Sequence, residues 1–168
     1  MKAKSKPKAK SRAKRSWREK LADSKDLPKK GTIEGKLSNR WGEGTMVIPA
    51  PVEVDAAMKK IRRGKLTTID ALRKSLAKKH SVTIACPITT GIFAWIAAHA
   101  ADEAEQEGRA RVTPYWRTLK AGGELNAKYP GGIKNLRARL MAEGHRIVKK
   151  GSRYFVADLA TKIVEPSI

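Results

Sequence analysis

The sequence Pro114-Tyr115-Trp116-Arg117-Thr118 places a proline, two large aromatic side chains and an arginine on one short segment. Two glycine-rich sequences follow it, Gly122-Gly123 and Tyr129-Pro130-Gly131-Gly132, and residues 133–143 then predict a helix that stops before a further glycine. We therefore expect an aromatic loop, a glycine-rich turn and a helix in this order. Aromatic rings on such a loop either stack on a nucleobase in a pocket or pack in the core beneath the loop.

Three helices are predicted between residue 53 and this loop. Apolar residues recur at helical spacing from Glu53, and we expect that helix to end at Gly64. Two more helices follow. The first is capped by Thr67 or Thr68 and the second by Thr89 or Thr90. Residues 81–88 join them, and the pair fits a helix-turn-helix. The third helix is expected to run from Gly91 to about Gln106, with a solvated acidic end.

Arg146-Ile147-Val148 and Arg153-Tyr154-Phe155-Val156 flank the turn sequence Lys149-Lys150-Gly151-Ser152 and together predict a β-hairpin. A hairpin that follows a helix-turn-helix predicts a winged helix, so the expected fold class is mainly α with a small β-hairpin. We divide the chain into a disordered basic tail (1–15), an N-terminal extension or linker (16–52), the winged-helix domain (53–160) and a C-terminal tail (161–168). Within the extension we expect a short helix capped by Ser16, an irregular stretch over residues 23–44 and an extended piece over residues 45–51.

The formal net charge of +21 favours a polyanionic partner, and nucleic acid is the first candidate. Eight positive charges and no acid fall within residues 1–15, so the remainder still carries +13. A tail of this kind binds phosphates by releasing counterions. The excess of charge outside the tail indicates that the body of the protein is basic as well.

The single cysteine, Cys86, excludes an intramolecular disulfide and fits a reducing, cytoplasmic compartment, here the nucleoid. No apolar run has the length of a membrane span and no secretory signal is recognisable, so no membrane partner is expected. The three histidines show no ligand-like spacing, so we expect no metal and no cofactor.

Residues 54–144 resemble the C-terminal DNA-binding domain of the alkylguanine DNA alkyltransferases. Four sequences carry the resemblance: Gly64-Lys65-Leu66-Thr67-Thr68, Pro114-Tyr115-Trp116-Arg117, Lys128-Tyr129-Pro130-Gly131-Gly132 and Leu140-Met141-Ala142-Glu143-Gly144. Tyr115 stands where the family has its alkyl-accepting cysteine, and Trp116 stands where it has the histidine of the relay. Ile69 and Thr90 occupy the positions of the family's nucleotide-flipping tyrosine and intercalating arginine.

The resemblance implies a non-enzymatic protein, comparable to the alkyltransferase-like proteins, that binds duplex DNA and senses alkylated guanine for repair. A phenol is a much poorer alkyl acceptor than a thiolate. The predicted lesion pocket consists of Tyr115, Trp116, Tyr129, Pro130 and Glu143, and the predicted DNA contacts are Thr68, Thr89, Thr90, Gly91, Arg117, Lys149, Lys150 and Arg153. We also expect the protein to be a monomer and to have a repair-pathway protein as a partner.

Two other functions stay open. An active methyltransferase could use Cys86 as its nucleophile, although a lone cysteine is more often a small buried hydrophobe. The same charge also fits a general nucleoid or RNA-binding protein, although no set of stacking aromatics on a sheet is apparent. The preferred DNA sequence, the lesion and the downstream partner are not encoded in any motif of the chain.

Overall fold

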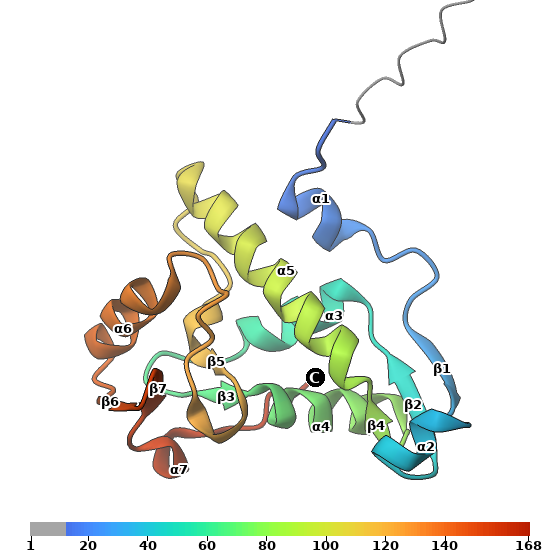
Figure 1. The fold of residues 1–168 in the computed structure, drawn as a ribbon. Helices are drawn as coiled ribbons and strands as arrows, with labels where there is room; N and C mark the ends of the chain where they lie inside the picture. Colours follow the sequence, from blue (N-terminus) through green and yellow to red (C-terminus); the bar gives the residue numbers. More distant parts are fainter. Residues whose placement is uncertain (1–12) are drawn as a thin grey trace, which may run out of the picture.

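The computed structural model describes residues 13–168, and its long helix α5 (Pro87–Gln106) crosses the whole molecule (Figure 1). Residues 1–12 of the predicted basic tail lie outside the described part. Helix α5 packs against α3 (Pro51–Lys59) and α1 (Trp17–Ala22), and it also contacts α4 (Ile69–His80). Small alanines at the buried positions of α5 allow these helices to approach closely.

The fold is mixed α/β, with more strand than the sequence predicted. Strands β1 (Lys29–Thr32) and β2 (Thr45–Ile48) pair antiparallel, and β2 pairs in parallel with β4 (Ile84–Ala85). Strand β3 (Thr67–Thr68) pairs in parallel with β5 (Thr118–Leu119). The predicted hairpin is confirmed as β6 (Ile147–Lys150) and β7 (Arg153–Val156), joined by a two-residue turn.

The stretch over residues 23–44 is not the irregular linker that we expected. It contains β1 and a short helix, α2 (Lys36–Trp41), and the antiparallel pairing with β2 fixes it to the body of the protein. The extended piece predicted over residues 45–51 is confirmed as β2. The segment between α4 and α5, predicted as a plain turn, also contains β4, whose partner strand lies almost forty residues earlier. Helix α6 (Gly132–Ala142) precedes the hairpin, and α7 (Leu159–Lys162) follows it. The C-terminal segment then pairs with Leu66 through a β-bridge at Ile163.

Two helix boundaries differ from the prediction at proline residues. Helix α3 begins at Pro51 and ends at Lys59, several residues before Gly64, and α5 begins at Pro87 rather than Gly91. Proline suits the first turn of a helix because the N–H groups of that turn have no partner within the helix, so the N–H group that proline lacks costs no hydrogen bond. Thr90 is consequently inside the first turn, where its hydroxyl donates to the carbonyl oxygen of Cys86 at 2.7 Å. The predicted caps are confirmed at Thr68 for α4, and at Ser16 for α1, where a capping box forms.

The N-terminal helix α1 docks on the C-terminal half of α5. The Trp17 ring stacks on the His99 ring at 4.5 Å and meets Trp95 edge-on at 4.8 Å. The Glu103 carboxylate accepts a hydrogen bond from the backbone N–H of Trp17 at 2.8 Å, and Arg18 bonds Glu103 and Glu107. The pKa of Glu103 is lowered, because these hydrogen bonds outweigh the effect of burial, which acts in the opposite direction. Part of the acidic end that we expected to be solvated is therefore a docking surface.

We expect the stacking of Trp17 on His99 to stabilise the docked state of α1. In a double-mutant cycle of Trp17→Ala and His99→Ala, urea unfolding should give a coupling free energy of about 0.5–1.5 kcal/mol. The same cycle with Trp41→Ala in place of Trp17→Ala is the control, because Trp41 lies in α2, away from His99, and should show no coupling. Equal coupling in both cycles would contradict a specific contact between α1 and α5.

Candidate nucleic-acid interface

The aromatic loop is folded into the protein rather than presented to solvent. A short 3-10 turn, Tyr115–Arg117, follows Pro114, and the Tyr115 side chain is fully buried. Its ring meets Trp116 and Tyr129 edge-on, at 5.3 and 5.9 Å between centroids. Its hydroxyl accepts a hydrogen bond from Asn135 at 3.0 Å, and burial raises the pKa of the phenol. Tyr115 is therefore a neutral, hydrogen-bonded core residue, and its oxygen is poorly suited to attack an alkyl group.

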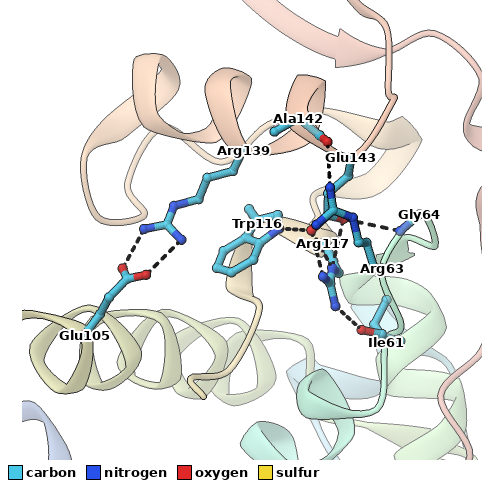
Figure 2. A network of polar contacts seen from close by, with 9 residues as sticks. All are labelled: Ile61, Arg63, Gly64, Glu105, Trp116, Arg117, Arg139, Ala142 and Glu143. Atoms are coloured by element: carbon cyan, nitrogen blue, oxygen red, sulfur yellow. Dashed lines mark hydrogen bonds and ion pairs between the residues drawn. The ribbon is translucent and has the colours of Figure 1, made fainter. Parts of the chain in front are cut away.

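Glu143 is the centre of the polar network beside this loop (Figure 2). Its carboxylate accepts hydrogen bonds from the Arg117 guanidinium at 2.7 to 3.1 Å and from the indole N–H of Trp116 at 2.9 Å. It also accepts from the backbone N–H of Gly64 at 3.4 Å. Burial alone would raise the pKa of Glu143, but the hydrogen bonds from Arg117 and Trp116 hold it below its ordinary value. The carboxylate is thus charged and joins the end of α6, the aromatic loop and the segment before β3.

A second ion pair lies on the other side of Trp116 (Figure 2). Arg139 on α6 bonds Glu105 on α5 at 2.5 and 3.2 Å, and its guanidinium lies 4.5 Å from the centre of the Trp116 ring. A guanidinium over an aromatic face gains cation–π attraction. Trp116 is therefore held between two arginine–glutamate pairs, which fix the orientation of its half-buried ring.

The structure brings the predicted pocket residues together but fills the space between them. Tyr115, Trp116, Tyr129 and Glu143 lie around the aromatic loop, and the Pro130 carbonyl accepts a hydrogen bond from Asn135. Tyr129 is only 3% exposed, and burial raises its pKa strongly. A nucleobase can therefore reach these rings only if the loop moves, and Trp116 is the most accessible of the three aromatics.

Several of the predicted DNA contacts point inward. Thr90 is fully buried, Thr68 is nearly so and caps α4, and the Thr89 hydroxyl is enclosed without a partner. The Arg117 guanidinium is bound by Glu143 and the Ile61 carbonyl oxygen. These four side chains cannot reach DNA in this conformation, because the contacts that build the fold already use or enclose them.

The hairpin cations, by contrast, are exposed. Lys149 and Lys150 lie at the end of β6, and Arg153 begins β7, where its side chain is 64% exposed although it also bonds Glu124 at 3.3 Å. The charged groups of Lys150 and Arg153 lie 5.5 and 5.3 Å from the centre of the Phe155 ring. The hairpin therefore carries a cluster of cations above apolar rings, and Lys149, Lys150 and Arg153 remain the predicted phosphate contacts.

The outer face of α5 carries Ile88, Ile92 and Trp95, which the sequence analysis did not select, beside the predicted DNA contact Gly91. Ile88 and Ile92 are 53% and 47% exposed, and together with Gly91 and Trp95 they line a groove of about 450 Å³. Asn126 and Lys128, from the loop before α6, close the other side of the groove, and the Trp95 indole N–H donates to the Lys128 carbonyl at 3.1 Å. The apolar residues of α5 are too closely spaced along the sequence to lie on one buried face. An exposed apolar face could have been predicted from this spacing.

Cys86 lies at the N-terminal cap of α5 and is buried. Within residues 13–168, no cluster of His, Cys, Asp or Glu side chains could hold a metal ion. No helix in that part of the chain has the length and apolar character needed to cross a membrane.

We expect Glu143→Gln to destabilise the protein strongly at neutral pH, because it leaves the Arg117 guanidinium buried without its counter-charge. Loss of one partner of a buried ion pair costs about 3–5 kcal/mol. Since the pKa of Glu143 is lowered on folding, its contribution is present above the ordinary carboxyl pKa and is lost as the pH falls through the folded-state value.

Urea unfolding at about pH 7 and about pH 3 tests this prediction. The free-energy difference between wild type and Glu143→Gln should shrink at the lower pH. Glu107→Gln, which alters a more exposed ion pair, is the matched control and should cost about 1 kcal/mol or less. Equal losses for the two variants would show that the Glu143 network does not stabilise the fold.

Comparison with known proteins gives a structural match only. No protein-family model and no curated protein matches the sequence. The structure of S. pombe ATL in complex with DNA superimposes with a TM-score of 0.50 at 19% identity, over 69% of this chain and 94% of that chain. S. pombe Atl1, in complex with damaged DNA that contains O6-carboxymethylguanine, gives a TM-score of 0.45 at 17% identity over the same shares. The match to S. pombe ATL shows that this chain shares the fold of that protein.

Proposed function

We propose that this chain is a non-enzymatic duplex-DNA-binding protein. The observation that carries the proposal is the way in which the charges are distributed. Most carboxylates of the described residues are engaged in ion pairs within the protein, including Glu53, Glu124 and Glu143, whereas lysines and arginines are in large excess. The cations that remain are free to bind phosphates, the dominant source of affinity for DNA.

In the proposed complex, α4 and α5 act as a helix-turn-helix and the β6–β7 hairpin acts as its wing. The N-terminal turns of α5 would face the bases, as in other helix-turn-helix proteins. Lys128 beside α5, and Lys149, Lys150 and Arg153 on the hairpin, would contact the backbone. The DNA in the S. pombe ATL complex supports this assignment by analogy of fold.

The chemistry of the loop supports the proposal that the protein is non-enzymatic. The position equivalent to an accepting cysteine holds a buried tyrosine whose oxygen is hydrogen-bonded to Asn135. The Glu143 carboxylate, which would anchor a proton relay, is occupied by Trp116 and Arg117. Neither group is free to generate a nucleophile.

We expect the triple variant Lys149→Ala/Lys150→Ala/Arg153→Ala to weaken duplex binding and to lower its dependence on salt. Each lost phosphate contact reduces the slope of log K against log[salt] by about 0.9, so the three together should reduce it by about 2–3. Fluorescence anisotropy with a labelled duplex at several salt concentrations measures both quantities.

The matched control is Lys25→Ala/Lys36→Ala/Arg40→Ala, which removes three exposed cations. Lys36 and Arg40 lie on α2, at the opposite side of the molecule from the hairpin (Figure 1), and Lys25 lies in the segment between α1 and β1. An equal change of slope in both triple variants would indicate that binding reflects net charge and not a wing. Comparable affinity for structured RNA and duplex DNA would favour the general nucleic-acid-binding alternative.

A second candidate function is the sensing of alkylated guanine, in which the protein would act as a monomer and present the lesion to a repair protein. The arrangement of Trp116, Tyr129 and Pro130 around the aromatic loop favours it. Because the rings are enclosed, this function requires the loop to open when DNA binds.

If lesion sensing occurs, a duplex with one O6-alkylguanine should bind more tightly than the unmodified duplex. Stacking on an aromatic side chain is worth about 1–3 kcal/mol per base, which corresponds to about 5- to 150-fold in affinity. Trp116→Leu should abolish the preference while leaving affinity for unmodified DNA unchanged. Equal binding of both duplexes by wild type would eliminate the sensing function and leave duplex binding in place.

Mass spectrometry of the protein after incubation with the alkylated duplex provides the control for catalysis. The mass of the peptide that contains Cys86 should stay unchanged, because that side chain is enclosed at the start of α5. A gain of one alkyl group on Cys86 would contradict the proposal that the protein is non-enzymatic.

A further inference from the structure

Helix α6 and the β6–β7 hairpin line a groove of about 500 Å³ whose residues have no part in the functions proposed above. Three of the lining residues are apolar, namely Ile133 and Met141 on α6 and Tyr154 on β7. Met141 is 57% exposed, more than any other large apolar side chain in the described part of the chain, whereas Leu136 and Leu140 on the same helix are buried. Neighbouring exposed apolar side chains commonly mark a surface that a partner covers.

The spacing of the apolar residues in the groove suits a helical partner. Ile133 and Met141 are eight residues apart on α6, which corresponds to about 12 Å along the helix axis. Ala138 also lines the groove and contributes only a methyl group between them. A partner helix with apolar residues at positions i, i+3 or i+4, and i+7 presents an apolar stripe of about this length. The flexible thioether of Met141 can adapt to the side chains of such a stripe.

Cations surround these apolar residues. Lys134 and Arg137 line the groove, and both are exposed. The guanidinium of Arg137 and the ammonium group of Lys149 lie 5.3 and 5.7 Å from the centre of the Tyr154 ring. No lining residue is acidic, and within residues 13–168 no carboxylate forms an ion pair with Lys134 or Arg137. The groove is thus complementary to a partner that carries carboxylates beside an apolar stripe.

The strand register shows which face of the hairpin belongs to the groove. Lys149 pairs with Tyr154, and Lys150 pairs with Arg153, so the two pairs project to opposite faces. Tyr154 lines the groove, whereas Lys150 and Arg153 lie near the ring of Phe155 on the other face. Two of the three proposed phosphate contacts of the hairpin therefore point away from the groove, and a partner can occupy it without displacing them.

We infer that the groove between α6 and the hairpin is a docking site for an acidic amphipathic helix of another protein. The apolar stripe of that helix covers Ile133, Met141 and Tyr154, and its carboxylates pair with Lys134 and Arg137. Burial of the exposed apolar side chains supplies affinity, and the ion pairs at the rim fix the orientation of the helix. The site goes beyond DNA binding, because the residues that line it are not among the proposed duplex contacts.

A fluorescein-labelled synthetic peptide of about five helical turns is the probe that tests the inference. It has leucine at the positions of one helical stripe and glutamate at most others, and a scrambled peptide of the same composition keeps the charge without the stripe. In fluorescence anisotropy with the full chain at about 0.15 M salt, the amphipathic peptide should bind roughly tenfold more tightly than the scrambled one. Equal affinity for both peptides would overturn the inference, because binding would then reflect net charge alone.

Substitution of Met141 tests the apolar centre of the groove. Met141→Gln removes an exposed apolar side chain but keeps a good helix former, and it should weaken binding of the amphipathic peptide roughly tenfold. Leu37→Gln makes a similar change at an exposed position of α2 and should leave the affinity unchanged. Urea unfolding verifies that both variants are folded. Equal peptide affinities of the two variants would overturn the inference.

Substitution of the two α6 cations tests the rim of the groove. Lys134→Ala/Arg137→Ala should weaken binding of the amphipathic peptide roughly fivefold and reduce its dependence on salt. Lys36→Ala/Arg40→Ala removes one exposed lysine and one exposed arginine from α2 and is the matched control. An equal loss of peptide affinity in both double variants would overturn the assignment of the carboxylates to this groove.

The outcomes also distinguish the docking site from the duplex-binding function. Met141→Gln should bind duplex DNA as tightly as wild type, and a loss equal to its loss of peptide affinity would place the groove in the DNA interface and overturn the inference. Dimerisation of wild type in sedimentation velocity that Met141→Gln abolishes would also overturn it, because a second copy of the chain would then cover the groove. Binding of the amphipathic peptide by wild type without any binding of duplex DNA would remove the proposed function and support the docking site.

Discussion

The buried carboxylate of Glu143 is the interaction on which the arrangement of the aromatic loop depends. It takes hydrogen bonds from Arg117, Trp116 and the backbone of Gly64, three groups that belong to separate parts of the chain. Arg117 in turn donates to the Ile61 carbonyl at 2.7 Å. A buried charge is tolerated only when its partners satisfy it completely, so the loop, the end of α6 and the segment before β3 must all take their observed positions together.

The same requirement accounts for the contacts at the centre of the molecule. Tyr115 fills the space above Tyr129, and its hydroxyl is satisfied by Asn135. Trp116 donates directly to Glu143 and lies beneath Arg139. The polar groups around the aromatic loop are thus engaged in contacts that stabilise the fold.

Features with a local cause could be predicted from the sequence, and those that depend on distant partners could not. The cap at Thr68 and the hairpin turn after Lys150 follow from neighbouring residues, and both are confirmed. The two-residue strands β3 and β4 could not be recognised, because each exists only through a partner strand about forty to fifty residues away. Arg117 was predicted as a DNA contact, and its ion pair with Glu143 was not predicted, since Glu143 lies 26 residues later and no local pattern connects the two.

The two ends of α5 are electrostatically different, and this difference determines what each end can contact. Acidic residues near a helix C-terminus are unfavourable to the helix dipole. Here Glu103 is compensated by the N-terminal N–H of α1, and Glu105 by Arg139, so the acidic end is used to bind other parts of the protein. The first turn of α5 contains no acidic residue, so its partial positive charge is not opposed within the helix. The end of α5 that begins at Pro87 therefore keeps an unopposed partial positive charge, while the opposite end is fixed to α1 and α6.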